Sequence, residues 1–238
     1  MSLLRIENLT ARHGQLQAVR GISLEVSEGE TLALVGANGA GKTTLLRTVA
    51  GAHRPATGRV LLDGADVSAL PAYRRLALGI ALVPEGRRLF ADMTVEENLL
   101  VARAHGRPGP WNIERVLEAF PMLRARIKAK AGSLSGGEQQ ATAIGRALVA
   151  NPRVLLLDEV SLGLAPVAVE RVYECLESLI AGGATIVLVE QDLARALRVA
   201  TRVACMLEGR VVLEGGAAGM TREQVTEAYF GLGRGQPA

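Results

Sequence analysis

A glycine-rich segment, Gly36-Ala37-Asn38-Gly39-Ala40-Gly41-Lys42-Thr43-Thr44, has the spacing of a phosphate-binding loop. An apolar run precedes it and a helix-forming stretch follows it, as the pattern G-x-x-x-x-G-K-[ST] requires. In such a loop, backbone N–H groups converge on an anion at a helix N-terminus. We expect Lys42 to reach the β- and γ-phosphates of a nucleotide, and the Thr43 hydroxyl to ligate Mg²⁺, which prefers oxygen ligands. Thr44 is a candidate for a further phosphate contact.

Two adjacent carboxylates, Asp158 and Glu159, follow a continuous apolar run at residues 154–157. Such a run is typical of a central parallel strand that is covered on both faces. Doubly wound sheets place their chemistry at the carboxyl ends of these strands. Asp158 is therefore a candidate to hold Mg²⁺, directly or through water, and Glu159 to polarise an attacking water. The alternative, two solvated residues at a strand end, is weakened by the glycine-rich loop elsewhere in the chain.

A second glycine motif, Leu134-Ser135-Gly136-Gly137-Glu138-Gln139-Gln140, has the residues of a helix start. Serine is a good N-cap, glycines leave the first backbone N–H groups bare, and the helix dipole favours an anion there. The phosphate loop of this chain has no need of a second such site. We therefore expect Ser135, Gly136 and Gly137 to close over a nucleotide that another subunit holds, which predicts a dimer.

Composition limits the class of protein. The hydrophobic content of 49% excludes a disordered chain. The length of 238 residues suits one domain with a subdomain. No apolar run approaches the ~18 to 20 residues that span a bilayer, and we expect no signal peptide. Cys175 and Cys205 are too few and too far apart for a disulfide framework or a zinc site, so buried free thiols are expected. The net charge of +3 is interspersed with acidic residues, which argues against a nucleic-acid partner.

Periodicity predicts the elements that position these motifs. Strands are expected at residues 3–9, 18–26, 31–35, 59–62, 80–83, 154–157, 185–189, 203–207 and 210–214. Helices are expected at residues 42–50, 94–104, 113–120, 137–149, 167–180 and 193–199. This order predicts an α/β fold in which an antiparallel β layer precedes a parallel α/β core, and a helical insertion carries the second glycine motif. Loose segments are expected at residues 106–110 and 231–238.

In this order and spacing, the three motifs resemble the Walker A, signature and Walker B elements of ABC-type ATPases, over essentially the whole chain. The resemblance implies a P-loop NTPase (RecA-like) core with an N-terminal antiparallel β subdomain and an inserted helical subdomain. The single nucleotide-binding domain would span residues 1–238, with the β layer and core at 1–89 and 151–238 and the helical subdomain at 90–150. It also implies ATP and Mg²⁺ as ligands. Two such domains would pack head to tail, with ATP between the Walker A loop of one and the signature serine of the other.

Four further segments are closer still to one branch of that family, the second ATP-binding subunit of bacterial branched-chain amino acid importers. They are residues 83–90, 93–99, 161–166 and 189–191, and residues 227–231 resemble the C-terminus common in that branch. The resemblance implies a peripheral subunit at the cytoplasmic face of the cell membrane, docked on two transmembrane permease subunits. A second homologous ATPase is the expected partner, although a homodimer stays open, and a periplasmic solute-binding protein acts indirectly. Urea importers are a near sister group, towards which a glutamine at position 85 would have pointed.

Several positions depart from the general ABC pattern. His13 stands where an aromatic residue usually stacks on adenine; its smaller ring can still stack, and a plain loop histidine is the alternative. Glu85 replaces the Q-loop glutamine, and its carboxylate could approach Mg²⁺ or sense the membrane partner. Gln191 replaces the histidine that commonly contacts the γ-phosphate, and it carries no charge. Loss of one charge-assisted contact to a transition state commonly costs ~10²-fold in rate. Val160 replaces the proline that usually follows the catalytic glutamate.

The sequence thus predicts an ATP-hydrolysing subunit of an ABC importer for branched-chain, hydrophobic amino acids. Glu159, Gln191 and Glu85 are the candidate catalytic residues, and Thr43, Asp158 and Glu85 the candidate metal ligands. A catalytically weak regulatory subunit that binds ATP and mainly gates is the chief alternative. A soluble ABC ATPase of DNA repair or translation usually has two nucleotide domains or long insertions. A small-molecule P-loop kinase has no use for the second glycine motif.

Overall fold

The computed structural model describes residues 2–230, which divide into two compact units. The terminal unit contains Met1–Leu70 and Thr185–Ala238, and the middle unit contains Pro71–Ala184. The predicted division into a core at 1–89 and 151–238 and a helical subdomain at 90–150 stays a prediction. The expected loose tail, residues 231–238, lies outside the described residues, as does Gly231 of the C-terminal resemblance.

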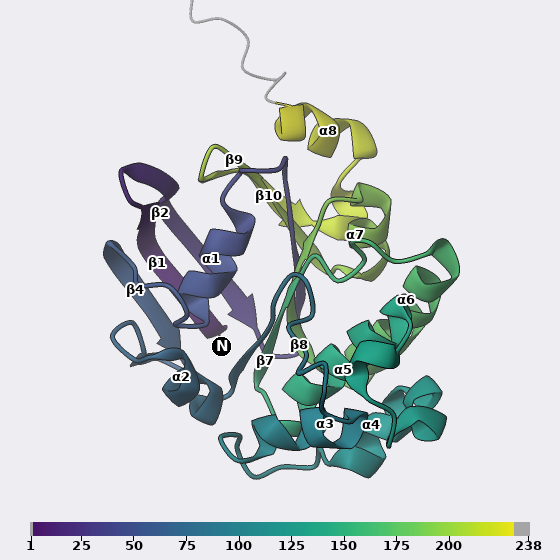
Figure 1. Ribbon diagram of the computed structural model, residues 1–238. Helices are drawn as coiled ribbons and strands as arrows, with labels where there is room; N and C mark the ends of the chain where they lie inside the picture. The colour runs from purple at the N-terminus through teal and green to yellow at the C-terminus, as the bar shows by residue number, and fades with distance from the viewer. Residues whose placement is uncertain (1, 231–238) are drawn as a thin grey trace, which may run out of the picture. The chain divides into compact units, whose positions relative to one another are not determined.

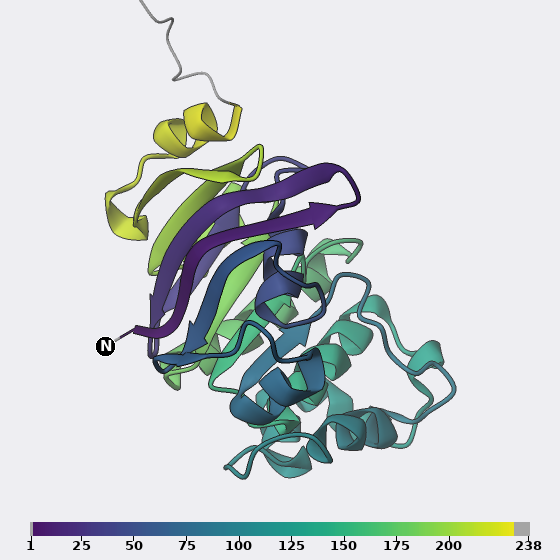
Figure 2. The same cartoon turned by 90° about the vertical axis from the view of Figure 1, so that its left-hand side faces the viewer.

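An antiparallel sheet in the terminal unit has the strand order β2-β1-β4-β5. Its strands are β1 (Ser2–His13), β2 (Leu16–Ser27), β4 (Thr57–Leu62) and β5 (Ala65–Asp66). Figure 2 shows β1 and β2 as a long curved hairpin, in which Ser2 lies opposite Ser27 and His13 opposite Leu16. The strands predicted at 3–9, 18–26 and 59–62 are confirmed with longer bounds, whereas the two-residue strand β5 has too short a pattern to be predicted.

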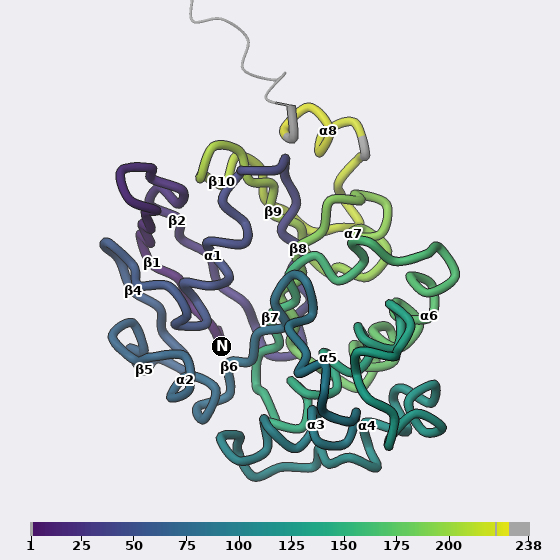
Figure 3. Tube along the Cα trace, in the orientation of Figure 1, coloured from purple at the N-terminus to yellow at the C-terminus, as the bar shows by residue number. Residues whose placement is uncertain are grey.

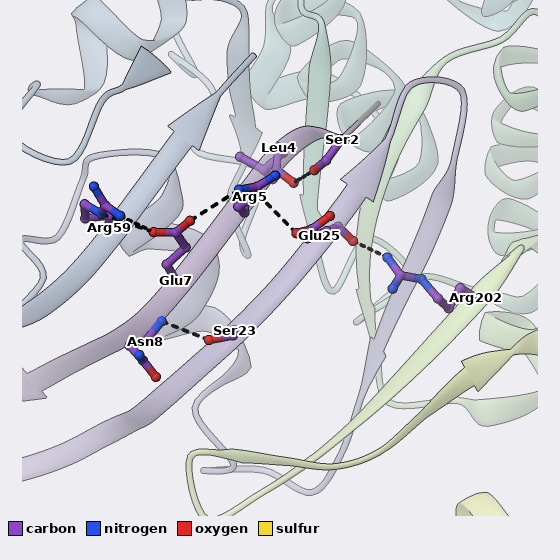
Figure 4. Close-up of polar contacts among 9 residues, drawn as sticks. All are labelled: Ser2, Leu4, Arg5, Glu7, Asn8, Ser23, Glu25, Arg59 and Arg202. Atoms are coloured by element: carbon purple, nitrogen blue, oxygen red, sulfur yellow. Dashed lines mark hydrogen bonds and ion pairs between the residues drawn. The ribbon is translucent and has the colours of Figure 1, made fainter. Parts of the chain in front are cut away.

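Charged side chains join the strands of this sheet on its exposed face (Figure 4). Arg59 lies 2.6 Å from Glu7, and Arg5 lies 3.5 Å from Glu7 and 3.1 Å from Glu25. Arg202, from another strand of the same unit, donates to the Glu25 carbonyl oxygen. Exposed ion pairs each contribute only about 0–1 kcal/mol. They favour the observed register of β4, β1 and β2, which places His13 at the end of the hairpin.

The terminal unit also contains the strand that leads into the glycine-rich loop. This strand, β3 (Thr31–Val35), pairs in parallel with β8 (Thr185–Glu190) and β9 (Arg202–Leu207), and β10 (Arg210–Gly216) pairs antiparallel with β9 (Figure 1). Every residue of β3 and β8 is buried, as expected of parallel strands covered on both faces. The prediction for 31–35 is confirmed at both ends.

In its described residues the terminal unit has the α-helices α1 (Lys42–Val49), α7 (Leu193–Val199) and α8 (Arg222–Phe230). Val225 of α8 is fully buried in an apolar cluster with Ala33, Val35, Val203 and Cys205. Helices α1 and α7 match the helices predicted at 42–50 and 193–199. Helix α8 was not predicted; among its side chains that the structure describes, Val225 is buried and Ala228 packs partly buried on the same cluster, which is too short a pattern to show a period.

The middle unit has two parallel strands, β6 (Ile80–Val83) and β7 (Val154–Asp158), with Val83 opposite Leu157. Its α-helices are α2 (Ala72–Leu78), α3 (Val95–Arg103), α4 (Ile113–Ala119), α5 (Gly136–Val149) and α6 (Pro166–Ala181). Short 3-10 turns follow at Pro121–Arg126 and Ala131–Ser133. All but α2 and the 3-10 turns match predicted elements within one or two residues.

Helices α3 and α4 pack against α5, as the trace in Figure 3 shows. Gly145 makes this approach possible, because a Cβ atom there would lie 2.6 Å from Val116 Cγ1 and 3.1 Å from Leu99 Cδ2. Close helix packing therefore requires the absence of a side chain at this position. The helices in turn fix the direction of α5, whose first residue follows Ser135.

The segment at residues 106–110 has no regular structure, but it is not loose as expected. A Cβ atom at Gly106 would lie 2.5 Å from Ala150 Cα, and the Arg107 N–H donates to the Ala150 carbonyl oxygen over 2.9 Å. Asn151 accepts from the Trp111 N–H over 2.7 Å. Composition suggested flexibility, whereas glycine here allows a close backbone contact with the end of α5.

Candidate functional site

The glycine-rich loop leaves β3 in a conformation that only glycine adopts easily. Gly36, Gly39 and Gly41 have φ angles of 151°, 81° and 99°. A Cβ atom would lie 2.2 Å from the Met206 carbonyl oxygen at Gly36, and 2.1 Å from the Ala18 carbonyl oxygen at Gly41. Among residues 2–230, nothing lies within 4 Å of a Cβ atom built at Gly39. The loop is thus packed on neighbouring backbone at its two ends and open in the middle, which suits it to cradle a ligand.

Lys42 is the cation of this loop. The residue is only 3% exposed, and its Nζ donates to the carbonyl oxygens of Gly36 over 2.6 Å and Ala37 over 3.0 Å. Helix α1 begins here after Gly41, which has no capping side chain, and no acidic residue lies in its first turn. The positive end of the helix dipole and the ammonium group therefore act together on an anion at the loop.

Gln191 lies beside the start of the glycine-rich loop. Strands β3 and β8 are parallel neighbours with Val35 opposite Glu190, so Gly36 and Gln191 leave the sheet at the same edge. The next residue, Asp192, caps α7 by accepting from the N–H groups of Ala194 and Arg195. The terminal unit thus brings together two predicted site residues that are far apart in the sequence.

His13 lies near the loop as well. Its Nε2 is 3.1 Å from Thr44 Oγ1, which joins the end of β1 to the first turn of α1. The residue is exposed, and its ring centroid lies 4.7 Å from that of His53, with 44° between the ring planes. No motif or spacing predicts His53 as a neighbour of the site, because it follows α1 in an irregular segment.

The middle unit carries the two carboxylates predicted at a strand end. Asp158 is the last residue of β7 and is 1% exposed. Glu159 follows in the left-handed region, with a φ of 50°, a conformation that costs a non-glycine residue ~1–3 kcal/mol and is often found at functional sites. Val160 is fully buried, so its apolar side chain has a packing role.

Glu85 leaves the neighbouring strand at the same edge. Strand β6 ends at Val83, opposite Leu157 of β7, and Glu85 lies exposed in the turn that follows. Parallel strands therefore place Glu85 and the pair Asp158–Glu159 at one edge of the middle unit.

Ser135 is the N-cap of α5, as predicted from its type. Its hydroxyl accepts from the Glu138 N–H, and its own N–H donates to Glu138 Oε2 over 2.8 Å, which completes a capping box. Partial burial raises the pKa of Glu138, but the hydrogen bonds from Ser135 and the contact with Arg126 outweigh it and hold the pKa below its usual value. The first turn of α5 is therefore stabilised by its own side chains.

The two glycines of this motif are closely packed. A Cβ atom would lie 3.0 Å from Leu164 Cδ2 at Gly136 and 2.9 Å from Ala168 Cβ at Gly137. Beside them is a cavity of about 220 Å³. Its lining includes Ser135, Gly137 and, from α6, Val167, Ala168 and Arg171. This volume is below the roughly 300–1,000 Å³ of small-molecule sites, so it is not a nucleotide pocket by itself.

Two arginines hold the turn after β6, which contains Glu85, against α5 by hydrogen bonds. Arg146 donates to the carbonyl oxygens of Arg88 over 2.9 Å and Arg87 over 3.0 Å, and Arg87 Nη1 donates to Gln139 Oε1 over 2.9 Å. Arg87 and Arg88 both have positive φ angles, 63° and 48°, so the turn is strained and externally held. Burial lowers the pKa of Arg146. Motifs do not reveal this contact, because its acceptors are backbone carbonyls.

Oxygen donors suited to Mg²⁺ are present in the described part of the chain. Within residues 2–230 no group of three His, Cys, Asp or Glu side chains could hold a metal ion. Mg²⁺ usually takes one or two protein oxygens and completes its shell with phosphate and water. The Thr43 hydroxyl in the terminal unit and the Asp158 carboxylate in the middle unit are each an oxygen donor of that kind, so each residue type fits the ion.

Two other expectations concern the whole chain. Cys175 and Cys205 are buried and form no disulfide, as expected, and burial raises the pKa of each thiol to about 11. In the described part of the chain, every helix is too short or too polar to cross a lipid bilayer.

The chain resembles transport proteins along its length. Residues 19–161 match the pattern of the ABC transporter family. The high-affinity branched-chain amino acid transport ATP-binding protein BraG of Pseudomonas aeruginosa is 43% identical over 96% of this chain and 100% of that protein. A probable branched-chain amino acid transport ATP-binding protein, LivF of Archaeoglobus fulgidus, is 38% identical over 90% of this chain and 92% of its own. Nod factor export ATP-binding protein I of Rhizobium meliloti is 36% identical over 95% of this chain and 69% of its own.

Solved structures confirm the fold. A nucleotide-free ATP-binding cassette from an ABC transporter matches with a TM-score of 0.82 and 28% identity, over 96% of this chain and 99% of that one. A dimeric cassette in a post-hydrolysis state, bound to ADP and phosphate, matches with a TM-score of 0.79 and 27% identity, over 91% and 100%. The predicted fold class, a P-loop NTPase domain of the ABC type, is therefore correct, and the chain belongs to the ABC transporter family as an ATP-binding subunit, an ATPase coupled to transport.

Proposed function

We propose that this chain is an ATP-hydrolysing subunit of an importer for branched-chain amino acids. The observation that carries the proposal is the 43% identity to BraG over the full length of that relative, whose name states this transport activity. The LivF relative supports the same substrate class. In this proposal the ATPase does not bind the amino acid, so the substrate is inferred from these relatives alone.

In this proposal the terminal unit holds the nucleotide. Backbone N–H groups of residues 36–44 cradle the phosphates, and Lys42 exchanges the carbonyl oxygens of Gly36 and Ala37 for β- and γ-phosphate oxygens. Gln191, which leaves the sheet beside Gly36, donates a neutral hydrogen bond to the γ-phosphate. Thr43 in the terminal unit, and Asp158 and Glu85 in the middle unit, are the proposed ligands of Mg²⁺, which would neutralise charge on the phosphates when bound.

The middle unit then activates water and contacts the ATP that a partner subunit holds. Glu159 accepts a proton from the attacking water, and its left-handed backbone is of the kind often found at functional sites. Ser135, Gly136 and Gly137 cap the ATP held by a second, homologous ATPase subunit. A heterodimer is our proposal, because the branch that this chain resembles works with a different ATPase.

The complete transporter would contain two transmembrane permease subunits and would be stimulated by a periplasmic solute-binding protein. This chain would lie at the cytoplasmic face of the membrane. The turn with Glu85 is the proposed contact with the permease, and Arg146 would transmit its movement to α5 because it holds the turn on that helix.

The test is substrate-stimulated ATP hydrolysis by the complex of this chain with its membrane partners in lipid vesicles. Its binding protein is supplied with leucine, isoleucine or valine, or with urea as the control solute. Stimulation by the branched-chain amino acids alone supports the proposal. Stimulation by urea alone would assign the chain to the sister group instead.

A catalytically weak, regulatory subunit is the second candidate, and Gln191 favours it. A neutral amide beside the phosphate loop provides one charge-assisted contact fewer than an imidazolium would. Single-turnover hydrolysis in the assembled complex, with each of the two half-sites disabled in turn, separates the candidates. Hydrolysis confined to the partner's Walker A site would identify this chain as regulatory.

A further inference from the structure

His53 lies next to the proposed base site without belonging to any recognised motif. It follows α1 after Gly51, whose φ of 76° turns the chain. The N–H groups of Ala52 and His53 then donate to the same Arg47 carbonyl oxygen over 2.9 Å and 3.1 Å. The backbone that carries the His53 ring is therefore tied to the end of α1.

The His53 ring packs on the ring of His13. Their centroids are 4.7 Å apart and their planes are tilted by 44°, a geometry that is favourable for aromatic pairs. The Nε2 of His53 is buried and, among the described residues, accepts and donates no hydrogen bond. His53 thus contributes ring surface, which restricts how far His13 can turn.

Thr44 also restrains the His13 ring, through a hydrogen bond between the two side chains. His13 Nε2 lies 3.1 Å from Thr44 Oγ1, and Thr44 is 8% exposed in the first turn of α1. When the Thr44 hydroxyl donates its proton to a phosphate oxygen, its oxygen can still accept an N–H from His13. The orientation of His13 is therefore linked to occupation of the phosphate loop.

We propose that His53 is a positioning residue for nucleotide recognition, which together with Thr44 fixes the His13 ring for stacking on adenine. The inference rests on the proposed function, with His13 in the role that the sequence resemblance implies, stacking on the base of ATP. His53 and Thr44 both limit rotation of the exposed His13 ring in the free protein, so less rotational freedom is lost when the base binds. The terminal unit then binds base and phosphates as one ligand and prefers ATP over a polyphosphate chain without a base.

The test compares two ligands of the full chain by titration calorimetry. Mg·ATP presents base and phosphates, whereas Mg·tripolyphosphate presents phosphates alone. The variants are His53→Ala, which removes the ring, and His53→Phe, which keeps one. His105→Ala is the matched control, because His105 is the third histidine of the chain and lies exposed in the middle unit.

We expect His53→Ala to weaken Mg·ATP binding about two- to tenfold and to change Mg·tripolyphosphate binding less than twofold. His53→Phe should restore ATP affinity to within about twofold of the wild type, and His105→Ala should change neither ligand. An unchanged ATP affinity in His53→Ala, or equal weakening for both ligands, overturns the inference. Failure of the wild type to bind either ligand overturns the proposed function as well.

A measurement on the wild type avoids any folding defect of the variants. The three histidines can be followed separately by the NMR signals of their Cε1–H protons. Mg·ATP should shift the His13 and His53 signals together and leave that of His105 unchanged, because a stacked base alters the ring field at the pair. Tripolyphosphate should shift both signals less. A His13 signal that moves without His53 would contradict the proposed pair.

Discussion

Helices α1 and α5 both begin at a glycine-rich motif, but their first turns are stabilised in different ways. Helix α1 follows Gly41, without a capping side chain or an acidic residue in its first turn, and with Lys42 at its start. Helix α5 follows Ser135, whose capping box with Glu138 satisfies backbone N–H groups and places a carboxylate at the positive end of the dipole. The start of α1 is therefore suited to a strong anion, whereas that of α5 is already stable by itself.

The difference separates two roles that the same kind of helix end can have. An uncapped N-terminus beside a buried ammonium binds phosphate tightly. A capped N-terminus keeps its shape without a ligand and can close on a nucleotide presented from outside. On this basis we expect changes in the terminal unit to affect nucleotide affinity, and changes in the middle unit to affect turnover or the partner's site.

The largest expected effect comes from Glu159→Gln in the middle unit. Removal of a general base commonly slows the chemical step ~10²- to 10⁴-fold, whereas Mg·ATP binding should stay within about twofold of the wild type. Steady-state hydrolysis and calorimetric affinity measure the two quantities. Glu208→Gln is the matched control, because Glu208 has a similar φ of 48° against 50° for Glu159. Near-normal turnover would remove Glu159 from the role of base.

Lys42→Ala should lower the affinity for Mg·ATP. Loss of a charge-assisted contact to phosphate corresponds to roughly 1.5–3 kcal/mol, or about a 10- to 150-fold weaker Mg·ATP complex. Lys128→Ala is the control, since Lys128 pairs with Glu96 at the surface of the middle unit and should leave affinity unchanged. An equal effect of both substitutions would mean that general charge, and not the loop, governs binding.

Ser135→Ala tests whether the cap of α5 has a function beyond stability. Loss of a side-chain cap typically lowers the free energy of unfolding by ~1 kcal/mol. Thr94→Ala should do the same, because Thr94 forms the equivalent capping box with Glu97 on α3. Only Ser135→Ala should slow hydrolysis by the assembled transporter, by up to about tenfold, because one neutral hydrogen bond contributes about 0.5–1.5 kcal/mol. If both variants change the free energy of unfolding and the rate of hydrolysis by the same amounts, the proposal that Ser135 caps the partner's ATP is contradicted.

Thiol labelling gives the smallest effect and compares the two units in one chain. Cys205 lies in the terminal unit and Cys175 in the middle unit, each with a pKa raised to about 11. Since the thiolate reacts, alkylation of the folded chain at pH 8 should be slow for both and should accelerate as the pH rises towards 11. ATP should slow the alkylation of Cys205 several-fold and that of Cys175 less, because a ligand suppresses opening of the unit that binds it. Mass spectrometry of the labelled peptides measures the two rates. Equal protection would show that the two units open together.

Much of the fold could be predicted where a pattern is local. The predicted and observed bounds of β3, β6 and α7 agree, because continuous apolar runs or helical spacing end at clear turn residues. Helix α2 and strand β5 were not predicted, since short exposed elements have too few buried positions to leave a period. The bare start of α1 and the Ser135 cap were predictable because both depend on neighbours within a few residues.

The sequence by itself determined the glycine-rich loop before α1, the serine cap of α5, the carboxylates at the end of β7 and the resemblance to ABC ATPases. Only the tertiary structure decided that Gln191 leaves the sheet beside Gly36, that His53 packs on His13, and that Arg146 holds the turn after β6. The physical reason is the range of the interactions. Caps and loops depend on backbone geometry within one turn of chain, whereas these contacts require strand register, ring packing and carbonyl acceptors that residue types along the sequence do not specify.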